Sequence, residues 1–262
     1  MLSALTSFRR FARLSLAEAE GRLRVLAGRP PRFCGAWPNR AAALAAVPKG
    51  KLPGYDHEDI AEISFQAMCR VMPWDYPVLF WLQRDWHTGL KVLDAGGHMG
   101  TKYIAFDRVL PVGQSEWTVL DLPGIVAAAR ARQARGALPS ALRFVTTPAE
   151  AGAADVFLAS GLLQYLDVPL SDLLSQLPAP PRRIILNKVA TRDGPTVVTL
   201  EQIGAARVPY QIRNRETFEA ELQTLGYTVM DSWEIPELSH TIGTHPRLGP
   251  STSRGYVLER GD

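Results

Sequence analysis

Residues 91–100, Lys-Val-Leu-Asp-Ala-Gly-Gly-His-Met-Gly, constrain the fold of this 262-residue chain more than any other segment. A short apolar run ends in a carboxylate, Asp94, and passes directly into a glycine-rich turn. The apolar run predicts a buried parallel strand, and glycine lets the backbone turn tightly and approach a ligand without a Cβ in the way. We therefore expect a strand, a ligand-binding loop and a helix over 101–110. The loop glycines are Gly96, Gly97 and Gly100.

The acid before the glycines separates two classes of nucleotide-like ligand. A dinucleotide places its pyrophosphate against such a loop, where the carboxylate of Asp94 would repel it. A cationic ligand end suits Asp94, and the amino group of S-adenosylmethionine is such a cation. A nicotinamide-dependent oxidoreductase stays as an alternative that Asp94 disfavours, and a tight strand-to-helix turn in some other α/β protein also stays open.

A second carboxylate follows the next predicted strand. Residues 117–121, Trp-Thr-Val-Leu-Asp, read as a short apolar strand that ends in Asp121, about twenty residues beyond Gly100. A carboxylate at this place in a nucleotide-binding βαβ unit can accept hydrogen bonds from both ribose hydroxyls. The alternative reading makes Asp121 an ordinary cap of a helix over 125–135.

From Lys91 onward strands and helices alternate, which is typical of an α/β domain with a parallel sheet. A segment over 190–213 can form a hairpin around Gly204, with Tyr210 and Arg213 available to a sugar or phosphate. Strands are predicted at 90–94, 117–121, 142–146, 155–160, 182–189, 228–235 and 255–260, and a last helix, capped by Asn214, at 215–225.

Three segments together resemble class I S-adenosylmethionine-dependent methyltransferases: Asp-x-Gly-Gly-x-x-Gly at 94–100, Asp-Leu-Pro at 121–123, and Ser-Gly-Leu-Leu-Gln-Tyr-Leu-Asp at 160–167. Within this class the chain is similar to a bacterial family assigned as methyltransferases and associated with surface-polysaccharide gene clusters. It departs from the class at His98, where the middle glycine usually falls, and at Gln164, where a histidine is common.

The resemblance implies an α/β fold with a Rossmann-like class I methyltransferase sheet, mostly parallel with a C-terminal antiparallel hairpin, plus an N-terminal helical segment. It also implies S-adenosyl-L-methionine as cofactor. The residues expected to hold it are Asp94, Gly96, Gly97, Gly100, Asp121 and Ser160.

Methyl transfer to a hydroxyl requires removal of the hydroxyl proton, which directs attention to bases with a suitable pKa. The loop over 237–246 carries two histidines, His240 and His245, which we expect to act as the catalytic base in O-methylation of a sugar or another small hydroxyl-bearing metabolite. His98, Asp193 and Lys188, if burial lowers its pKa, are further candidates. Because Gln164 is not a base at neutral pH, a non-catalytic methyltransferase-like module at a membrane surface stays open.

The chain divides into a basic amphipathic helix over 1–32, a helical lead-in or cap over 33–88, with helices over 56–72 and 76–86, and a methyltransferase domain over 89–262. Arginines crowd the first segment against two glutamates. Residues 1–28 therefore suit either a peripheral membrane contact or docking on the same domain or on a second subunit. The arginines are Arg9, Arg10, Arg13, Arg22, Arg24, Arg29 and Arg32.

The cysteines, the charge distribution and the hydropathy of the chain indicate its compartment and its kind of partner. Cys34 and Cys69 lie far apart and follow no metal-binding spacing, so we expect no structural metal and a reducing compartment. The near-neutral body of the chain has no nucleic-acid footprint, and the sequence has neither a signal peptide nor a membrane-spanning run. These features indicate a cytoplasmic protein that can also associate with a membrane. We expect its acceptor to be a small molecule or a glycan.

Overall fold

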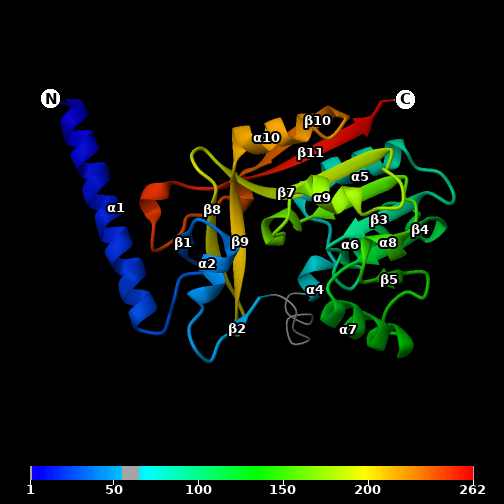
Figure 1. The fold of residues 1–262 in the computed structure, drawn as a ribbon, viewed down its shortest axis with the longest axis horizontal. Helices are drawn as coiled ribbons and strands as arrows, with labels where there is room; N and C mark the ends of the chain where they lie inside the picture. The colour runs from blue at the N-terminus through cyan, green and yellow to red at the C-terminus, as the bar shows by residue number, and fades with distance from the viewer. Residues whose placement is uncertain (1, 55–64, 262) are drawn as a thin grey trace.

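A computed structural model of the chain describes residues 2–54 and 65–261, with side chains from residue 9 onward. Its centre is a sheet in the spatial order β5-β4-β3-β6-β7-β11-β10 (Figure 1). Neighbouring strands run parallel from β5 to β7, whereas β11 is antiparallel to both β7 and β10. The strands are β3 (Lys91–Ala95), β4 (Glu116–Leu120), β5 (Arg143–Val145), β6 (Val156–Ser160), β7 (Arg183–Arg192), β10 (Tyr227–Ile235) and β11 (Thr252–Arg260).

This arrangement confirms the predicted α/β fold, including the antiparallel hairpin that closes the sheet. Each strand predicted from residue 90 onward is present. In an alternating α/β pattern, short apolar runs are buried most readily as strands of a sheet that helices cover on both faces. Asn214 caps the last helix as predicted, since its side chain accepts the backbone N–H of Thr217 at 2.7 Å.

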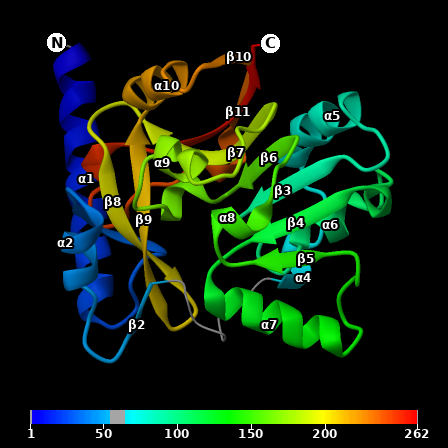
Figure 2. The ribbon, with the colours of Figure 1, turned by 45° about the vertical axis from the view of Figure 1, so that its right-hand side comes forward.

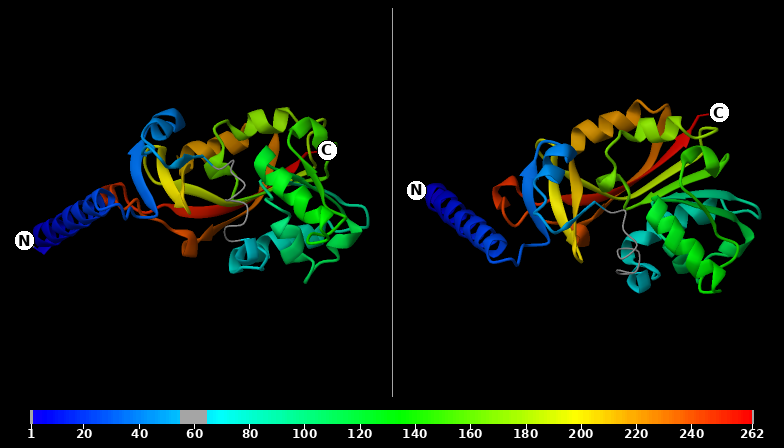
Figure 3. Two further views of the ribbon diagram at one scale, coloured as in Figure 1. Left: turned by 90° about the horizontal axis from the view of Figure 1, so that it is seen from below. Right: turned by 60° about the horizontal axis from the view of Figure 1, so that its bottom comes forward.

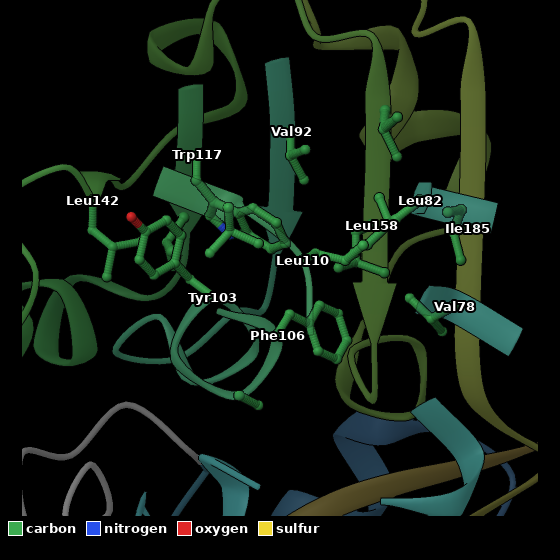
Figure 4. Close-up of a cluster of buried hydrophobic side chains, with 14 of the residues drawn as sticks. Val78, Leu82, Val92, Tyr103, Phe106, Leu110, Trp117, Leu142, Leu158 and Ile185 are labelled. Atoms are coloured by element: carbon green, nitrogen blue, oxygen red, sulfur yellow. The ribbon is translucent and has the colours of Figure 1, made fainter. Parts of the chain in front are cut away.

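Two layers of helices cover the sheet, and each seals a separate core. The larger core lies under α4 (Phe65–Met68), α5 (Tyr76–Arg84), α6 (Thr101–Phe106) and α7 (Pro123–Ala134). Figure 4 shows its centre, where the Trp117 indole from β4 lies among Tyr103 and Phe106 of α6 and Val92 of β3. The opposite core lies under α8 (Pro148–Ala151), α9 (Leu170–Ser175) and α10 (Arg215–Gln223).

The lead-in over 33–88 differs from the helical prediction in its first part. Residues Phe33–Trp37 form a strand, β1, which pairs antiparallel with β8 (Val197–Ile203). The segment continues through α2 (Arg40–Ala45) and a two-residue strand, β2 (Leu52–Pro53). Part of the predicted helix over 56–72 lies outside the described residues, and α4 is its described portion.

The predicted hairpin over 190–213 is present and larger than expected. β8 and β9 (Ala206–Asn214) pair along seven residues around a turn at Gly204, which has a φ of 54°. The last residues of β7 pair in parallel with β9, so the hairpin and β1 extend the main sheet sideways. Figure 2 shows this second part between α1 (Leu2–Leu26) and the parallel sheet.

The N-terminal helix α1 extends from the body as an appendage (Figure 3). It contacts the loop before β11 through one face: Gly21 is buried against the backbone of Gly243, and Arg247 forms an ion pair with Glu18 at 3.1 Å. Among the helices of the described residues, none has an apolar stretch of the length needed to cross a bilayer.

Candidate functional site

The glycine loop between β3 and α6 turns through left-handed backbone conformations. Gly96 and Gly100 have φ values of 70° and 78°, and the intervening His98 has a φ of 57°. A side chain at such a φ costs about 1–2 kcal/mol, so the loop holds His98 in a strained conformation. The His98 ring is buried, with its centroid 6.4 Å from that of Phe65.

Asp94 lies beneath this loop. Its side chain is 1% exposed, and its Oδ2 accepts a hydrogen bond from Trp117 Nε1 at 3.3 Å, while Oδ1 has no partner among the described residues. A Cβ added at Gly97 would lie 2.5 Å from the carboxylate, so glycine is required for the loop to cover it. Burial raises the pKa of Asp94 to about 7 against the lowering effects of Trp117 and the nearby Lys102.

Asp121 joins the glycine loop to the end of β4. Its Oδ2 accepts the backbone N–H of His98 at 2.7 Å, and its Oδ1 accepts that of Leu122 at 2.8 Å. The structure therefore gives Asp121 a loop-positioning role that the sequence did not predict.

The end of β6 and the middle of the longer strand β7 bring further polar groups to the same edge of the sheet. Asn187 donates from Nδ2 to Ser160 Oγ at 3.3 Å and to the Trp74 carbonyl at 3.1 Å, while its buried Oδ1 lacks a partner in the described chain. The next residue, Lys188, has a φ of 60°, and burial of its amine together with Lys102 lowers the pKa of this group to about 8.

A buried ion pair fixes the lead-in segment to the glycine loop. Lys102, in the first turn of α6, contacts both carboxylate oxygens of Asp75 at 2.7 Å, and neither side chain is more than 7% exposed. Asp75 also accepts the backbone N–H of Met72 at 3.0 Å. The sequence did not predict this ion pair. Its two residues are 27 positions apart in separate helical segments, so no local spacing indicates that they are in contact.

The predicted catalytic histidines contact β1 and residues near them in their own loop. The ring of His240 packs against Phe33 of β1, with centroids 4.8 Å apart, and Nδ1 of His245 is 2.9 Å from the Thr244 hydroxyl. Burial lowers the pKa of both histidines, with smaller contributions from Arg32 and Arg22 respectively. Tyr210, predicted to face a ligand, is instead buried against Phe33.

Six predicted cofactor residues, by contrast, come together at the carboxyl ends of β3, β4 and β6. Open α/β sheets bind ligands at this edge. The buried oxygens of Asp94 and Asn187 that lack partners, and a glycine loop that a Cβ would obstruct, fit a ligand with a cationic or hydrogen-bond-donating end. The six residues are Asp94, Gly96, Gly97, Gly100, Asp121 and Ser160.

No family model and no curated protein matches the chain. Among solved structures it is similar to magnesium protoporphyrin IX methyltransferase from Synechocystis PCC 6803 with bound SAM, at 18% identity over 75% of this chain and 79% of that one, with a TM-score of 0.46. It is also similar to Burkholderia thailandensis 1,6-didemethyltoxoflavin-N1-methyltransferase with bound S-adenosylhomocysteine, at 22% identity, 72% and 79% coverage and a TM-score of 0.46.

A third similar structure is the CcbJ methyltransferase from Streptomyces caelestis, at 11% identity over 78% of this chain and 98% of that one, with a TM-score of 0.48. At such identities and TM-scores the likeness carries no conclusion about what this chain binds.

Proposed function

We propose that this chain is an S-adenosylmethionine-dependent methyltransferase that acts on a small molecule. The observation that carries the proposal is the buried carboxylate of Asp94, which has one oxygen without a partner and lies under a glycine loop at the carboxyl edge of the sheet. A buried carboxylate is costly unless it is paired, and an ammonium group on the ligand would supply the partner.

Each predicted cofactor residue has a role in this proposal. Asp94 attracts the ammonium end of the cofactor, Asp121 accepts hydrogen bonds from the ribose, and the glycines let the backbone approach. Ser160, hydrogen-bonded to Asn187, borders the site at the end of β6. When bound, S-adenosylmethionine supplies a methyl group on a sulfonium, so the protein mainly has to position the acceptor and remove its proton.

Calorimetry with S-adenosylhomocysteine tests this function. We expect one site per chain, and Asp94→Asn and Asp121→Asn proteins should each bind at least about tenfold more weakly, because a lost charged hydrogen bond costs about 1.5–3 kcal/mol. Asp172→Asn, at an exposed position of α9, is the matched control. Unchanged binding in both site variants contradicts the proposal, and tight NADH or NADPH binding would favour the oxidoreductase alternative.

For the reaction itself we propose O-methylation of a hydroxyl on a sugar or related metabolite. The base assignment to His240 or His245 stays a prediction, and the position of His240 beside Phe33 does not support it. Replacing the working base should lower turnover by about 10²–10⁴-fold while S-adenosylhomocysteine still binds. Normal turnover in both His240→Gln and His245→Gln proteins would exclude the late-loop histidines.

We also propose that α1 holds the protein at an anionic lipid surface. The helix docks through the face that carries Gly21 and Glu18, which leaves the apolar stripe on another face exposed: Leu16 is 72%, Leu23 64% and Leu26 84% exposed. At 3.6 residues per turn, Arg9, Arg13 and Arg24 lie beside this stripe, and all three are exposed. An apolar stripe flanked by arginines is typical of helices that lie in a membrane interface.

A second copy of the chain fits this stripe less well. A symmetric helix pair would bring the flanking arginines of both copies together, and the acids of α1 are Glu18, already paired with Arg22 and Arg247, and Glu20. Like charges at such an interface oppose association. An anionic lipid surface satisfies both the apolar stripe and the arginines.

Vesicle flotation tests the membrane surface. The protein should float with vesicles rich in phosphatidylglycerol but not with phosphatidylcholine alone, and the pair Leu16→Glu and Leu23→Glu should abolish flotation. The pair Val229→Glu and Met230→Glu, which adds the same charge at exposed positions of β10, should float normally. Flotation of the Leu16/Leu23 variant would contradict the assignment, and a dimer that this variant disrupts would identify a second copy instead.

A further inference from the structure

A small cavity borders the candidate site on the side of the β8–β9 hairpin. Its volume is about 170 Å³, and it lies between the end of β1, the start of α2, the turn after β6 and the hairpin. Gln164 forms part of its wall and is 6% exposed, yet its Oε1 has no hydrogen-bond partner among the described residues. A buried amide oxygen without a partner is costly, so a hydrogen-bond donor on a ligand would stabilise this atom.

The polar groups that line the cavity match hydroxyl groups. Three are side-chain amides, Asn39, Gln164 and Gln211, and each can both donate and accept hydrogen bonds, as a hydroxyl does. The charged lining groups are one cation, Arg40, and one carboxylate, Asp167, whose closest atoms are 4.0 Å apart. Because these charges offset each other, a neutral polyhydroxyl ligand fits better than a phosphate or a carboxylate.

The apolar part of the wall narrows the ligand class further. Among the described residues it consists of aliphatic groups and proline rings. These can contact the C–H groups of a saturated ring, and none of them has an aromatic face on which a planar phenol could stack. The cavity has room for a group of about the size of one sugar ring. The apolar lining residues are Pro38, Leu166, Val198 and Pro209.

Gln164 also connects the cavity to the amine of Lys188. A Cβ added at Gly161 would lie 3.1 Å from Lys188 Nζ and 3.6 Å from Gln164 Nε2, so both side chains converge on Gly161. Lys188 follows Asn187 in β7, just beyond the level at which β6 ends, and has a left-handed backbone conformation. Strained conformations of non-glycine residues persist where the surroundings hold them, and they concentrate at functional sites.

From this geometry we infer that the cavity binds the acceptor, a neutral sugar or comparable polyol, and that Gln164 orients the reacting hydroxyl toward Lys188, which removes its proton. The inference rests on the proposed methyltransferase function. As the hydroxyl oxygen bonds to the methyl carbon, the electron pair of the broken carbon–sulfur bond stays on sulfur, and the hydroxyl proton passes to the neutral amine of Lys188. The products are a methyl ether, S-adenosylhomocysteine and an ammonium that returns its proton to solvent.

Acceptor binding can be tested without the donor. Saturation-transfer NMR with a panel of neutral methyl hexopyranosides should show binding to the wild-type protein, and Gln164→Leu and Gln211→Leu should each weaken it at least tenfold. Gln202→Leu, an exposed position on the same hairpin, is the matched control and should bind normally. If none of the glycosides binds, or if both cavity variants bind like the wild type, the cavity assignment is wrong.

Transfer of a deuterated methyl group from S-adenosylmethionine to the bound glycosides, followed by mass spectrometry, tests Lys188. The wild-type rate should rise with pH and level off above about 8, since Lys188 must be neutral while Lys102, Asp75 and Asp94 face it. Lys188→Met should lose about 10²–10⁴-fold in turnover together with this pH dependence, whereas Lys91→Met, an exposed control, should lose neither.

The outcomes separate the inference from the function on which it rests. Glycoside binding without any S-adenosylhomocysteine binding would overturn the methyltransferase function and keep the sugar site. S-adenosylhomocysteine binding with normal turnover and an unchanged pH profile in Lys188→Met would keep the function and overturn the base. Binding of both ligands without any transfer would overturn the acceptor role of the cavity.

Discussion

At the scale of single residues, the candidate site contains strained backbone conformations and a buried charged group. Among the described residues, the non-glycine residues with positive φ are His98 and Lys188, and both lie at the carboxyl edge of the sheet. Asp94 is buried there with one unpartnered oxygen. Each feature costs about 1–3 kcal/mol, which the surrounding fold has to offset, and such costs are common at sites that bind ligands.

The pH dependence of stability should reveal the burial of Asp94. Its pKa is raised to about 7 from 3.8, so the folded state holds a proton that the unfolded state releases between these values. The free energy of unfolding therefore loses a contribution as pH rises from about 4 to 7, up to about 4 kcal/mol from this residue. Below pH 4 the cost is absent, and above pH 7 it is fully present.

Chemical denaturation of the wild type and Asp94→Asn at pH 5 and pH 8 measures this effect. The stability difference between the two proteins should favour Asp94→Asn more strongly at pH 8, because the other titrating groups are common to both and cancel. S-adenosylhomocysteine should reduce the pH effect in the wild type, since its ammonium stabilises the charged carboxylate. A difference that stays constant between the two pH values contradicts the raised pKa.

At the scale of elements, one arginine ties α5 to two strands of the sheet. Arg183, at the start of β7, is 2% exposed and forms ion pairs with Asp85 after α5, at 2.8 Å, and with Glu259 of β11, at 2.9 Å. Its guanidinium also lies 4.8 Å from the ring centroid of Trp81. A buried cation with two partners and an aromatic face fixes the orientation of these elements.

Removing Arg183 should therefore be costly. Arg183→Ala leaves Asp85 and Glu259 without their buried partner, and we expect a loss of about 3–5 kcal/mol in the free energy of unfolding. The adjacent Arg182 contacts the same glutamate at 3.2 Å with its side chain 65% exposed, so Arg182→Ala should cost less than about 1 kcal/mol. Urea denaturation of both variants provides the comparison, and equal losses would refute the buried network.

At the scale of the whole molecule, the sequence predicted the parallel sheet well and the added part less well. The strands β3 and β4 are short, largely apolar runs that end at or just before the carboxylates of the candidate site. One local pattern therefore predicted both the fold and the edge of the sheet where the candidate site lies. β1 was missed because Phe-Cys-Gly-Ala-Trp has no alternation and becomes a strand through β8, more than 160 residues away. The Asp75–Lys102 pair and the cavity at Gln164 likewise depend on tertiary contacts.

The appendage α1 gives a prediction at this scale. Among residues 9–26 of α1, Gly21 is the buried one, and the ion pair between Glu18 and Arg247 is partly exposed, with side-chain exposures of 20% and 48%. Removal of residues 1–28 should therefore change the free energy of unfolding by no more than about 1 kcal/mol and leave S-adenosylhomocysteine binding intact. Thermal denaturation and calorimetry check this, and an unfolded or non-binding truncation would show that α1 is part of the core structure.

The length of β7 has a consequence for cooperativity. Its first five residues pair with β6, its last two pair with β9, and β11 pairs with it from Arg183 to Thr191. One continuous strand therefore belongs both to the parallel sheet and to the part that carries the hairpin. Opening either part exposes amides of the same strand. In native-state hydrogen exchange the amides of β6, β7 and β9 should thus share one opening free energy and behave as a single foldon.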